Sequence, residues 1–210
     1  MRVTPFAPLY GALIGALGGA IYWLSVQIWP SSVAVILAMA ATALLTAQIR
    51  GGLPATRLDV TTSLLSLLIK YNALMALSAA KLPFAVAPNV PLALIMICGY
   101  AASFATFVSV SAARPGKSAP ASAVLSGTVT SGPVVSGGGL VLALLIGFAP
   151  AVLLGIPGLI GLAAAVVAGL GIIGLLRFKR SGASDDILAM TQLLSEACFY
   201  LGALASWKYV

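Results

Sequence analysis

The 210-residue chain contains no histidine and only four acidic residues, which are Asp59, Asp185, Asp186 and Glu196. The lack of histidine excludes a Ser-His-Asp triad, a zinc site with histidine ligands and a haem bound through histidine. Charged residues make up 7% of the chain, whereas soluble domains carry about 25%. Apolar residues make up 61%, so the composition excludes a soluble domain and indicates an integral membrane protein.

Cysteine is also scarce. Cys98 and Cys198 lie far apart, each within an apolar run and without a C-x-x-C partner. This placement indicates two small core side chains rather than a disulfide or a metal-binding pair. The net charge of +7 in a membrane chain indicates orientation and contact with anionic lipid headgroups, so we do not expect nucleic-acid binding.

Long apolar runs are what the sequence has in abundance. The hydrocarbon core of a bilayer is crossed by about 20 apolar residues in a helix. We therefore expect one integral membrane domain over residues 1–210, an all-α polytopic bundle of about seven transmembrane helices. Pro150 and Pro157 divide the longest apolar stretch into a tight hairpin of two helices. The expected spans are residues 9–28, 33–49, 61–80, 91–112, 140–155, 158–176 and 187–205.

The basic residues are distributed unequally between the two sides that seven spans define. Lys and Arg are enriched in cytoplasmic loops, so the count predicts a cytoplasmic N-terminus. A six-span arrangement would scramble this asymmetry. Three of the four acids, Asp59, Asp185 and Asp186, fall on or near the same side, so we expect a site to face the cytoplasm. The eight basic residues on the N-terminal side are Arg2, Arg50, Arg57, Arg114, Lys117, Arg177, Lys179 and Arg180, and the two on the other side are Lys81 and Lys208.

Glycine recurs at intervals of about one helical turn in two of the expected spans. Small residues at this spacing let helix backbones approach closely, and we interpret both series as helix-packing surfaces. The first series is Gly11, Gly15, Gly18 and Gly19, and the second is Gly161, Gly169, Gly171 and Gly174.

Two ionisable residues, Lys70 and Glu196, fall inside expected spans. Such residues are costly in a membrane and indicate function by default, and Glu196 shares a polar stripe with Gln192 and Ser195. The alternative is a structural ion pair between Glu196 and Lys70, and both interpretations stay open at this point.

Two short basic loops are either ordinary cytoplasmic flanks or phosphate-binding segments. Arg114-Pro115-Gly116-Lys117 places two cations beside a flexible turn, an arrangement that suits recognition of a diphosphate. The loop from Arg50 to Asp59 is of the same kind.

Taken in order, several segments resemble the cobalamin-5′-phosphate synthase family, also called adenosylcobinamide-GDP ribazoletransferase. The C-terminal segment is similar to the family pattern G-V-T-G-D-x-L-G-A-x-x-E/Q-L-x-E, with Asp186 at the position of its Asp, Asp185 in place of its Gly and Glu196 at its last Glu. The segments are residues 8–17 (PLYGALIGAL), 51–53 (GGL), 67–74 (LLIKYNAL), 113–115 (ARP) and 182–196 (GASDDILAMTQLLSE).

One segment departs from the family pattern. After GGL the family has H-x-D-G-L-A-D-x-x-D-G and a charged loop, which supply the carboxylates expected to hold Mg²⁺. Here residues 54–59 run almost directly into the next helix and only Asp59 remains. The resemblance therefore implies a magnesium site with two candidate ligands, Asp59 and Asp186, which would share the ion with a substrate diphosphate.

The resemblance implies a phosphotransferase of the late cobalamin pathway, embedded in the bacterial inner membrane with its active face towards the cytoplasm. In that reaction α-ribazole, or its 5′-phosphate, attacks adenosylcobinamide-GDP and GMP leaves. The implied roles are catalysis and Mg²⁺ binding for Asp186 and Asp59, and substrate binding for Arg114, Lys117, Lys70 and Glu196. Such a step needs positioning and charge neutralisation, which suits a site without histidine.

Two other functions stay open. The missing acidic run suggests a relative that has lost catalysis and acts as a membrane partner or a binder of cobamide precursors. The charges of Lys70 and Glu196 within spans suggest a small permease. The expected partners are the lipid bilayer and, by resemblance, the two substrates, with a second copy of the chain or other cobalamin-assembly proteins as further possibilities.

Overall fold

A computed structural model describes residues 6–49, 59–79, 90–112, 137–178 and 185–207, and all regular structure in these ranges is α-helical. The described residues form seven helices, one for each expected span, with every boundary within three residues of expectation. The helices are α1 (Ala7–Ser25), α2 (Ser31–Ile49), α3 (Asp59–Ser78), α4 (Val90–Ala112), α5 (Gly137–Leu153), α6 (Ile156–Phe178) and α7 (Asp185–Trp207).

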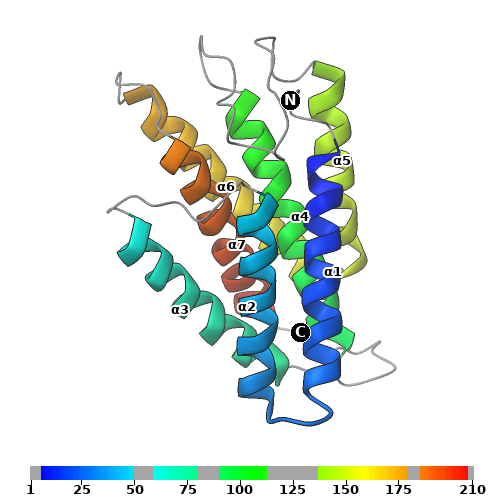
Figure 1. Ribbon diagram of the computed structural model, residues 1–210. Coiled ribbons are helices and arrows are strands. Elements are labelled where there is room, and N and C mark those ends of the chain that lie inside the picture. Colours follow the sequence, from blue (N-terminus) through cyan, green and yellow to red (C-terminus); the bar gives the residue numbers. More distant parts are fainter. Residues whose placement is uncertain (1–5, 50–58, 80–89, 113–136, 179–184, 208–210) are drawn as a thin grey trace.

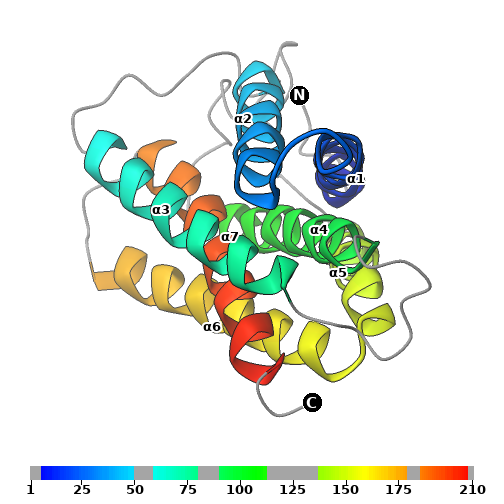
Figure 2. The ribbon, with the colours of Figure 1, turned by 90° about the horizontal axis from the view of Figure 1, so that it is seen from below.

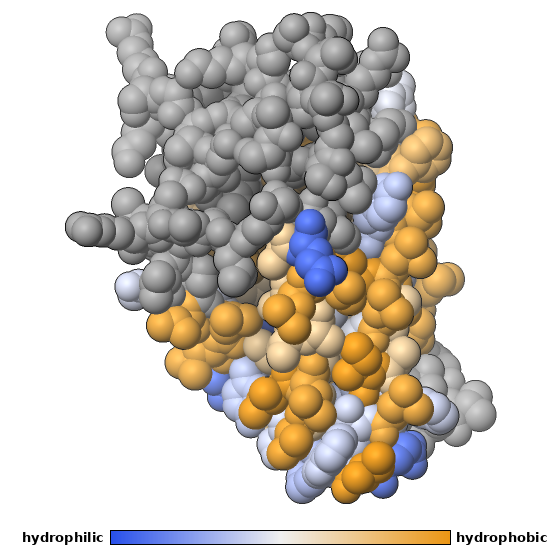
Figure 3. All heavy atoms as spheres, viewed as in Figure 1, coloured by the Kyte–Doolittle hydropathy of each residue, from blue (hydrophilic) through white to orange (hydrophobic). Residues whose placement is uncertain are grey.

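Four of these helices, α1, α2, α4 and α6, are long and apolar enough over their described residues to cross a membrane. Shorter apolar segments lie in α3, at Leu64–Ser78, and in α5. Large apolar side chains such as Leu13, Leu44 and Val167 point outward, and Figure 3 shows apolar residues over much of the described surface on one face. Exposure of such an apolar surface to water is unfavourable, so the fold is that of a multi-pass helical membrane protein.

Successive helices run in alternate directions, and α1 begins at the opposite end of the bundle from the end of α7 (Figure 1). The beginnings of α1, α3, α5 and α7 thus share one end with the ends of α2, α4 and α6. α4 lies at the centre and contacts α1, α3, α5, α6 and α7. α3 lies at the left edge of the bundle in Figure 1 and crosses in front of α7 in Figure 2.

The first glycine series packs α1 against its neighbours, as expected. A Cβ atom on Gly15 would come within 2.7 Å of the Ile97 Cα atom and the Met96 carbonyl oxygen of α4. Gly11 and Gly19 lie equally close to Tyr100 and Ala93 on the same helix, whereas Gly18 faces Thr42 of α2 as well as Met96. The absence of side chains therefore brings the α1 backbone directly onto α4.

The second series is only partly a packing surface. Gly161 lies against the Phe199 carbonyl oxygen of α7, and Gly169 lies near Thr106 of α4. A Cβ on Gly171 or Gly174 would meet no atom of the described residues within 4 Å. The interpretation is therefore confirmed for the first two glycines and not for the last two.

The expected hairpin between the fifth and sixth spans is present. α5 contains Pro150 and ends at Leu153, and α6 begins at Ile156 with Pro157 as its second residue. Gly155 between them has φ +68°, a conformation that glycine adopts without steric cost. Its N–H donates to the Val152 carbonyl oxygen at 3.0 Å and so completes the turn.

Candidate functional site

Lys70 of α3 and Glu196 of α7 form a buried ion pair, with 2.6 Å between Lys70 Nζ and Glu196 Oε1. The two residues are 6% and 3% exposed. The ion-pair interpretation of the two in-span charges is therefore confirmed.

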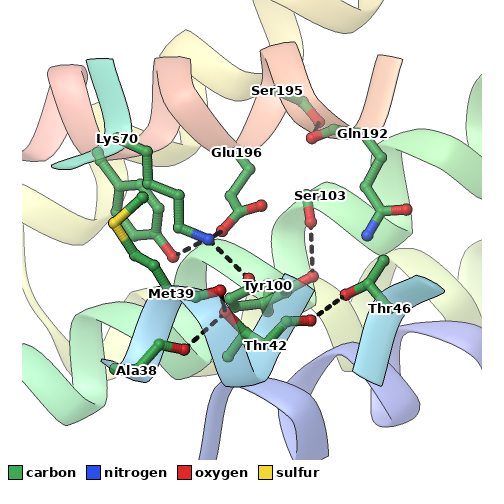
Figure 4. A network of polar contacts seen from close by, with 11 residues as sticks. Ala38, Met39, Thr42, Thr46, Lys70, Tyr100, Ser103, Gln192, Ser195 and Glu196 are labelled. Atoms are coloured by element: carbon green, nitrogen blue, oxygen red, sulfur yellow. Dashed lines mark hydrogen bonds and ion pairs between the residues drawn. The ribbon is translucent and has the colours of Figure 1, made fainter. Parts of the chain in front are cut away.

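Two tyrosines form hydrogen bonds with this pair, and Figure 4 shows one of them, Tyr100, beside Lys70 and Glu196. Lys70 Nζ donates to the Tyr100 hydroxyl of α4 at 2.6 Å and lies 4.4 Å from the centre of its ring. The Tyr200 hydroxyl of α7 donates to Glu196 Oε1 at 3.1 Å. On α2, the Thr42 hydroxyl donates to the Ala38 and Met39 carbonyl oxygens, at 2.9 and 3.0 Å, and lies near Tyr100 in Figure 4. We call these five residues from four helices, Thr42, Lys70, Tyr100, Glu196 and Tyr200, the ion-pair layer.

A glycine sets the spacing of α4 and α7 at this level. A Cβ on Gly99 would come within 2.6–2.8 Å of the Cε1, Cζ and hydroxyl atoms of Tyr200. Because position 99 has no side chain, the Tyr200 phenol lies close to the α4 backbone, and its hydroxyl donates to Glu196. Sequence reasoning missed Gly99 and Tyr100. The spacing of four residues between Glu196 and Tyr200 was a signal for the second tyrosine, because such residues are neighbours on one helix face.

The ion-pair layer is electrically neutral but costly to assemble. Removing Lys70 and Glu196 from water is unfavourable, and their attraction offsets this cost only with close geometry and further hydrogen bonds. The two tyrosine hydroxyls supply those hydrogen bonds. We therefore expect the layer to contribute more to the register of α3, α4 and α7 than to net stability.

A second group of polar residues lies one helical turn from the ion-pair layer. Its members follow Thr42 and Tyr100, or precede Lys70 and Glu196, by three or four positions, the spacing of neighbours on one helix face. All four steps lead towards the same end of the bundle, because α2 and α4 run one way and α3 and α7 the other (Figure 1). These residues, which we call the second polar layer, are Thr46, Ser66, Ser103 and Gln192.

Some of the other predicted site residues are the first residues of helices that begin at that same end. Arg114 and Lys117 follow the end of α4 in the sequence. Asp59 is the first residue of α3, and Asp185 and Asp186 are the first two of α7. Each helix start lies about three turns before the ion-pair layer. The side chains of Asp59 and Asp186, and the whole of Arg114 and Lys117, are outside the described residues, so their roles stay predictions.

No metal-binding cluster of three or more His, Cys, Asp or Glu residues occurs within the described part of the chain. Glu196 is the one acidic side chain in that part, and its charge is already balanced by Lys70. A metal site would therefore depend on Asp59 and Asp186. Cys98 and Cys198 are free thiols, in agreement with their interpretation as small core side chains, although Cys198 is only partly buried.

Comparison with known proteins gives one short similarity. A segment of 39 residues, 19% of this chain, is 54% identical to the adenosylcobinamide-GDP ribazoletransferase of Leptothrix cholodnii, of which it covers 15%. No family model matches the chain. No solved structure matches it either. The chain therefore has a weak, partial resemblance to this family of transferases.

Proposed function

We propose that this chain is a membrane phosphotransferase that joins α-ribazole, or its 5′-phosphate, to adenosylcobinamide-GDP with release of GMP. The 39-residue similarity to an adenosylcobinamide-GDP ribazoletransferase carries this proposal. The basic residues expected on the N-terminal side support an active face directed towards the cytoplasm, in the inner membrane of a bacterium.

The chemistry is a displacement at phosphorus. An oxygen of the ribazole substrate forms a bond to the phosphorus next to the cobinamide, and the bond from this phosphorus to the bridging diphosphate oxygen breaks. GMP leaves with the bridging oxygen, and the attacking hydroxyl loses its proton. Arg114 and Lys117 would neutralise the diphosphate, and Lys70 and Glu196 would contact neutral parts of the substrates.

Two carboxylates, those of Asp59 and Asp186, are the candidates for holding a magnesium ion. Mg²⁺ is commonly held by one or two carboxylates together with substrate phosphates. α3 and α7 contact each other and begin at the same end of the bundle, with Asp59 and Asp186 in their first turns. These two carboxylates would hold the ion, which supplies charge stabilisation on the transferring phosphoryl group when bound.

The test is GMP release by the protein in nanodiscs supplied with adenosylcobinamide-GDP, α-ribazole and magnesium. We expect Asp186→Asn to abolish release because it removes the charge of a metal ligand and keeps its shape. Asp185→Gly, which restores the family's residue, serves as the matched control and should retain release. Equal loss in both variants would show that this turn only begins a helix.

A second candidate follows from the missing acidic run, which favours a relative that binds cobamide precursors without turnover. Such a protein would bind adenosylcobinamide-GDP with little dependence on magnesium, and its binding would weaken with salt because exposed charges are screened. It would release no GMP. The permease alternative stays a prediction, because the 2.6 Å pairing of the two in-span charges that suggested it does not test it.

A further inference from the structure

The two carboxylate oxygens of Glu196 have different surroundings. Oε1 lies 2.6 Å from Lys70 Nζ and accepts a hydrogen bond from the Tyr200 hydroxyl at 3.1 Å. Both of these contacts are made to Oε1, so Oε2 depends on other donors, although Glu196 is only 3% exposed. A buried carboxylate oxygen is unfavourable without a hydrogen-bond donor, so this atom marks a place where a donor is expected.

Oε2 points towards the second polar layer. In Figure 4 this oxygen lies on the side away from Lys70, where Ser103 and Gln192 are drawn. The helix register agrees with this view. Gly99 of α4 lies against Tyr200 of the oppositely directed α7, so one turn further along α4, Ser103 comes level with Glu196.

Ser66 is a second polar group in need of a partner. It is 8% exposed, and its hydroxyl makes no hydrogen bond within the described part of the chain. Ser66 lies one turn before Lys70 on α3 and therefore shares the helix face that carries Lys70 towards Glu196. This observation is independent of the carboxylate because it comes from a different helix.

The remaining hydroxyls of the layer offer acceptors. Ser103 donates its hydroxyl hydrogen to the Tyr100 carbonyl oxygen at 2.9 Å, and Thr46 donates to the Thr42 carbonyl oxygen at 2.7 Å. Both oxygens keep lone pairs, as does Glu196 Oε2, whereas the Ser66 hydroxyl is able to donate. A group that donates at least one hydrogen bond and accepts another matches this set.

We propose that the second polar layer, together with Glu196 Oε2, is a binding subsite for a neutral hydroxyl or carboxamide group of a ligand. Lys70 and Glu196 cancel each other's charge, so the subsite attracts neither a phosphate nor an ammonium group. The identity of the ligand rests on the proposed function. α-Ribazole carries sugar hydroxyls and cobinamide carries carboxamides, and the subsite lies on the side of the ion pair nearer the expected phosphate and metal residues.

The experiment measures the affinity of the full chain in nanodiscs for α-ribazole and, separately, for adenosylcobinamide, by calorimetry. We expect Ser66→Ala and Ser103→Ala each to weaken the binding of one of these compounds roughly 3- to 10-fold, which corresponds to one lost hydrogen bond. The compound affected identifies the source of the group, a hydroxyl for α-ribazole and a carboxamide for adenosylcobinamide.

Ser111→Ala is the matched control. Ser111 lies on α4, is buried, and donates to a backbone oxygen, that of Phe107 at 2.8 Å, as Ser103 does. Its removal should leave both affinities unchanged. Retention of helical circular dichroism and a monodisperse elution profile shows that each variant is folded.

The outcomes separate the subsite from the proposed function. The subsite would be overturned if both serine variants kept wild-type affinities, or if Ser111→Ala weakened binding equally. GMP release by the wild-type protein would then show that the proposed function stands without the subsite. A wild-type protein that binds neither compound would overturn both.

Discussion

The interface between α1 and α4 and the interface between α3 and α7 hold helices together in opposite ways. α1 presents Gly11, Gly15 and Gly19 to α4, and their missing side chains let the two backbones touch. α3 instead reaches α7 through the long side chain of Lys70, which ends at Glu196. The first interface depends on the absence of side chains, whereas the second includes a charged side chain that reaches from one helix to the other.

The difference shows two ways in which particular helices are paired in a bilayer, where apolar burial does not favour one neighbour over another. Lipid tails are as apolar as leucine, so the hydrophobic effect does not drive helices together within a bilayer. Close backbone packing gives α1 and α4 many small attractions. α3 has Leu64, Leu65 and Leu68 exposed, and we expect the ion pair to contribute to its direction and register.

The largest expected effect comes from breaking the ion pair on one side. Lys70→Met leaves Glu196 buried without a counter-charge, and a loss of about 3–5 kcal/mol in the free energy of unfolding is expected. Reversible unfolding with SDS in mixed micelles measures it. The double variant Lys70→Met/Glu196→Met should recover most of the loss, because replacing both partners removes the unpaired charge. Losses that simply add would show that the two residues are not coupled.

The glycine interface should respond to a single methyl group. Gly15→Ala places a Cβ within 2.7 Å of α4 backbone atoms, so the helices must separate, at a cost of about 1–3 kcal/mol. The same unfolding assay measures this cost. Gly171→Ala, where a Cβ meets no described atom within 4 Å, is the matched control and should be neutral or slightly stabilising. If the two variants behave alike, close contact does not account for the first glycine series.

Gly99→Ala joins the two kinds of interface, because it adds a methyl group where α4 packs against the Tyr200 ring. Displacement of the ring removes a hydrogen bond from Glu196 as well as straining the packing, and a loss of about 1–2 kcal/mol is expected. In a Tyr200→Phe background the hydrogen-bond part of this loss should disappear. Full additivity of the two substitutions would contradict the role of Gly99 in placing the phenol.

The smallest effect is expected for Tyr200→Phe alone. Glu196 Oε1 keeps Lys70 at 2.6 Å and loses only the phenol at 3.1 Å, so about 0.6–1.5 kcal/mol should be lost. A loss as large as that of Lys70→Met would mean that the tyrosine, and not the lysine, is the main partner of the carboxylate.

The sequence predicted the seven helices because each span is a long apolar run closed by proline, glycine or charge. It also predicted the pairing of Lys70 with Glu196, because these are the two ionisable residues inside the expected spans. Tyr100, Gly99 and Ser66 were missed because nothing in their own helices distinguishes them, and their roles depend on which helices are neighbours. For the same reason Gly171 and Gly174 had the right spacing and no packing partner.

The ion pair joins the third helix of the bundle to the seventh, and this connection has a consequence for biogenesis. During synthesis Lys70 enters the membrane well before Glu196 is made, so for the time needed to add four more helices its charge has no partner. A long lysine side chain can meanwhile reach towards the headgroups. Once α7 is inserted, Glu196 becomes available as the partner of Lys70, and the lysine side chain turns into the bundle. An incompletely inserted chain would keep an unpaired charge in lipid, a feature by which membrane quality control can distinguish it from the finished protein.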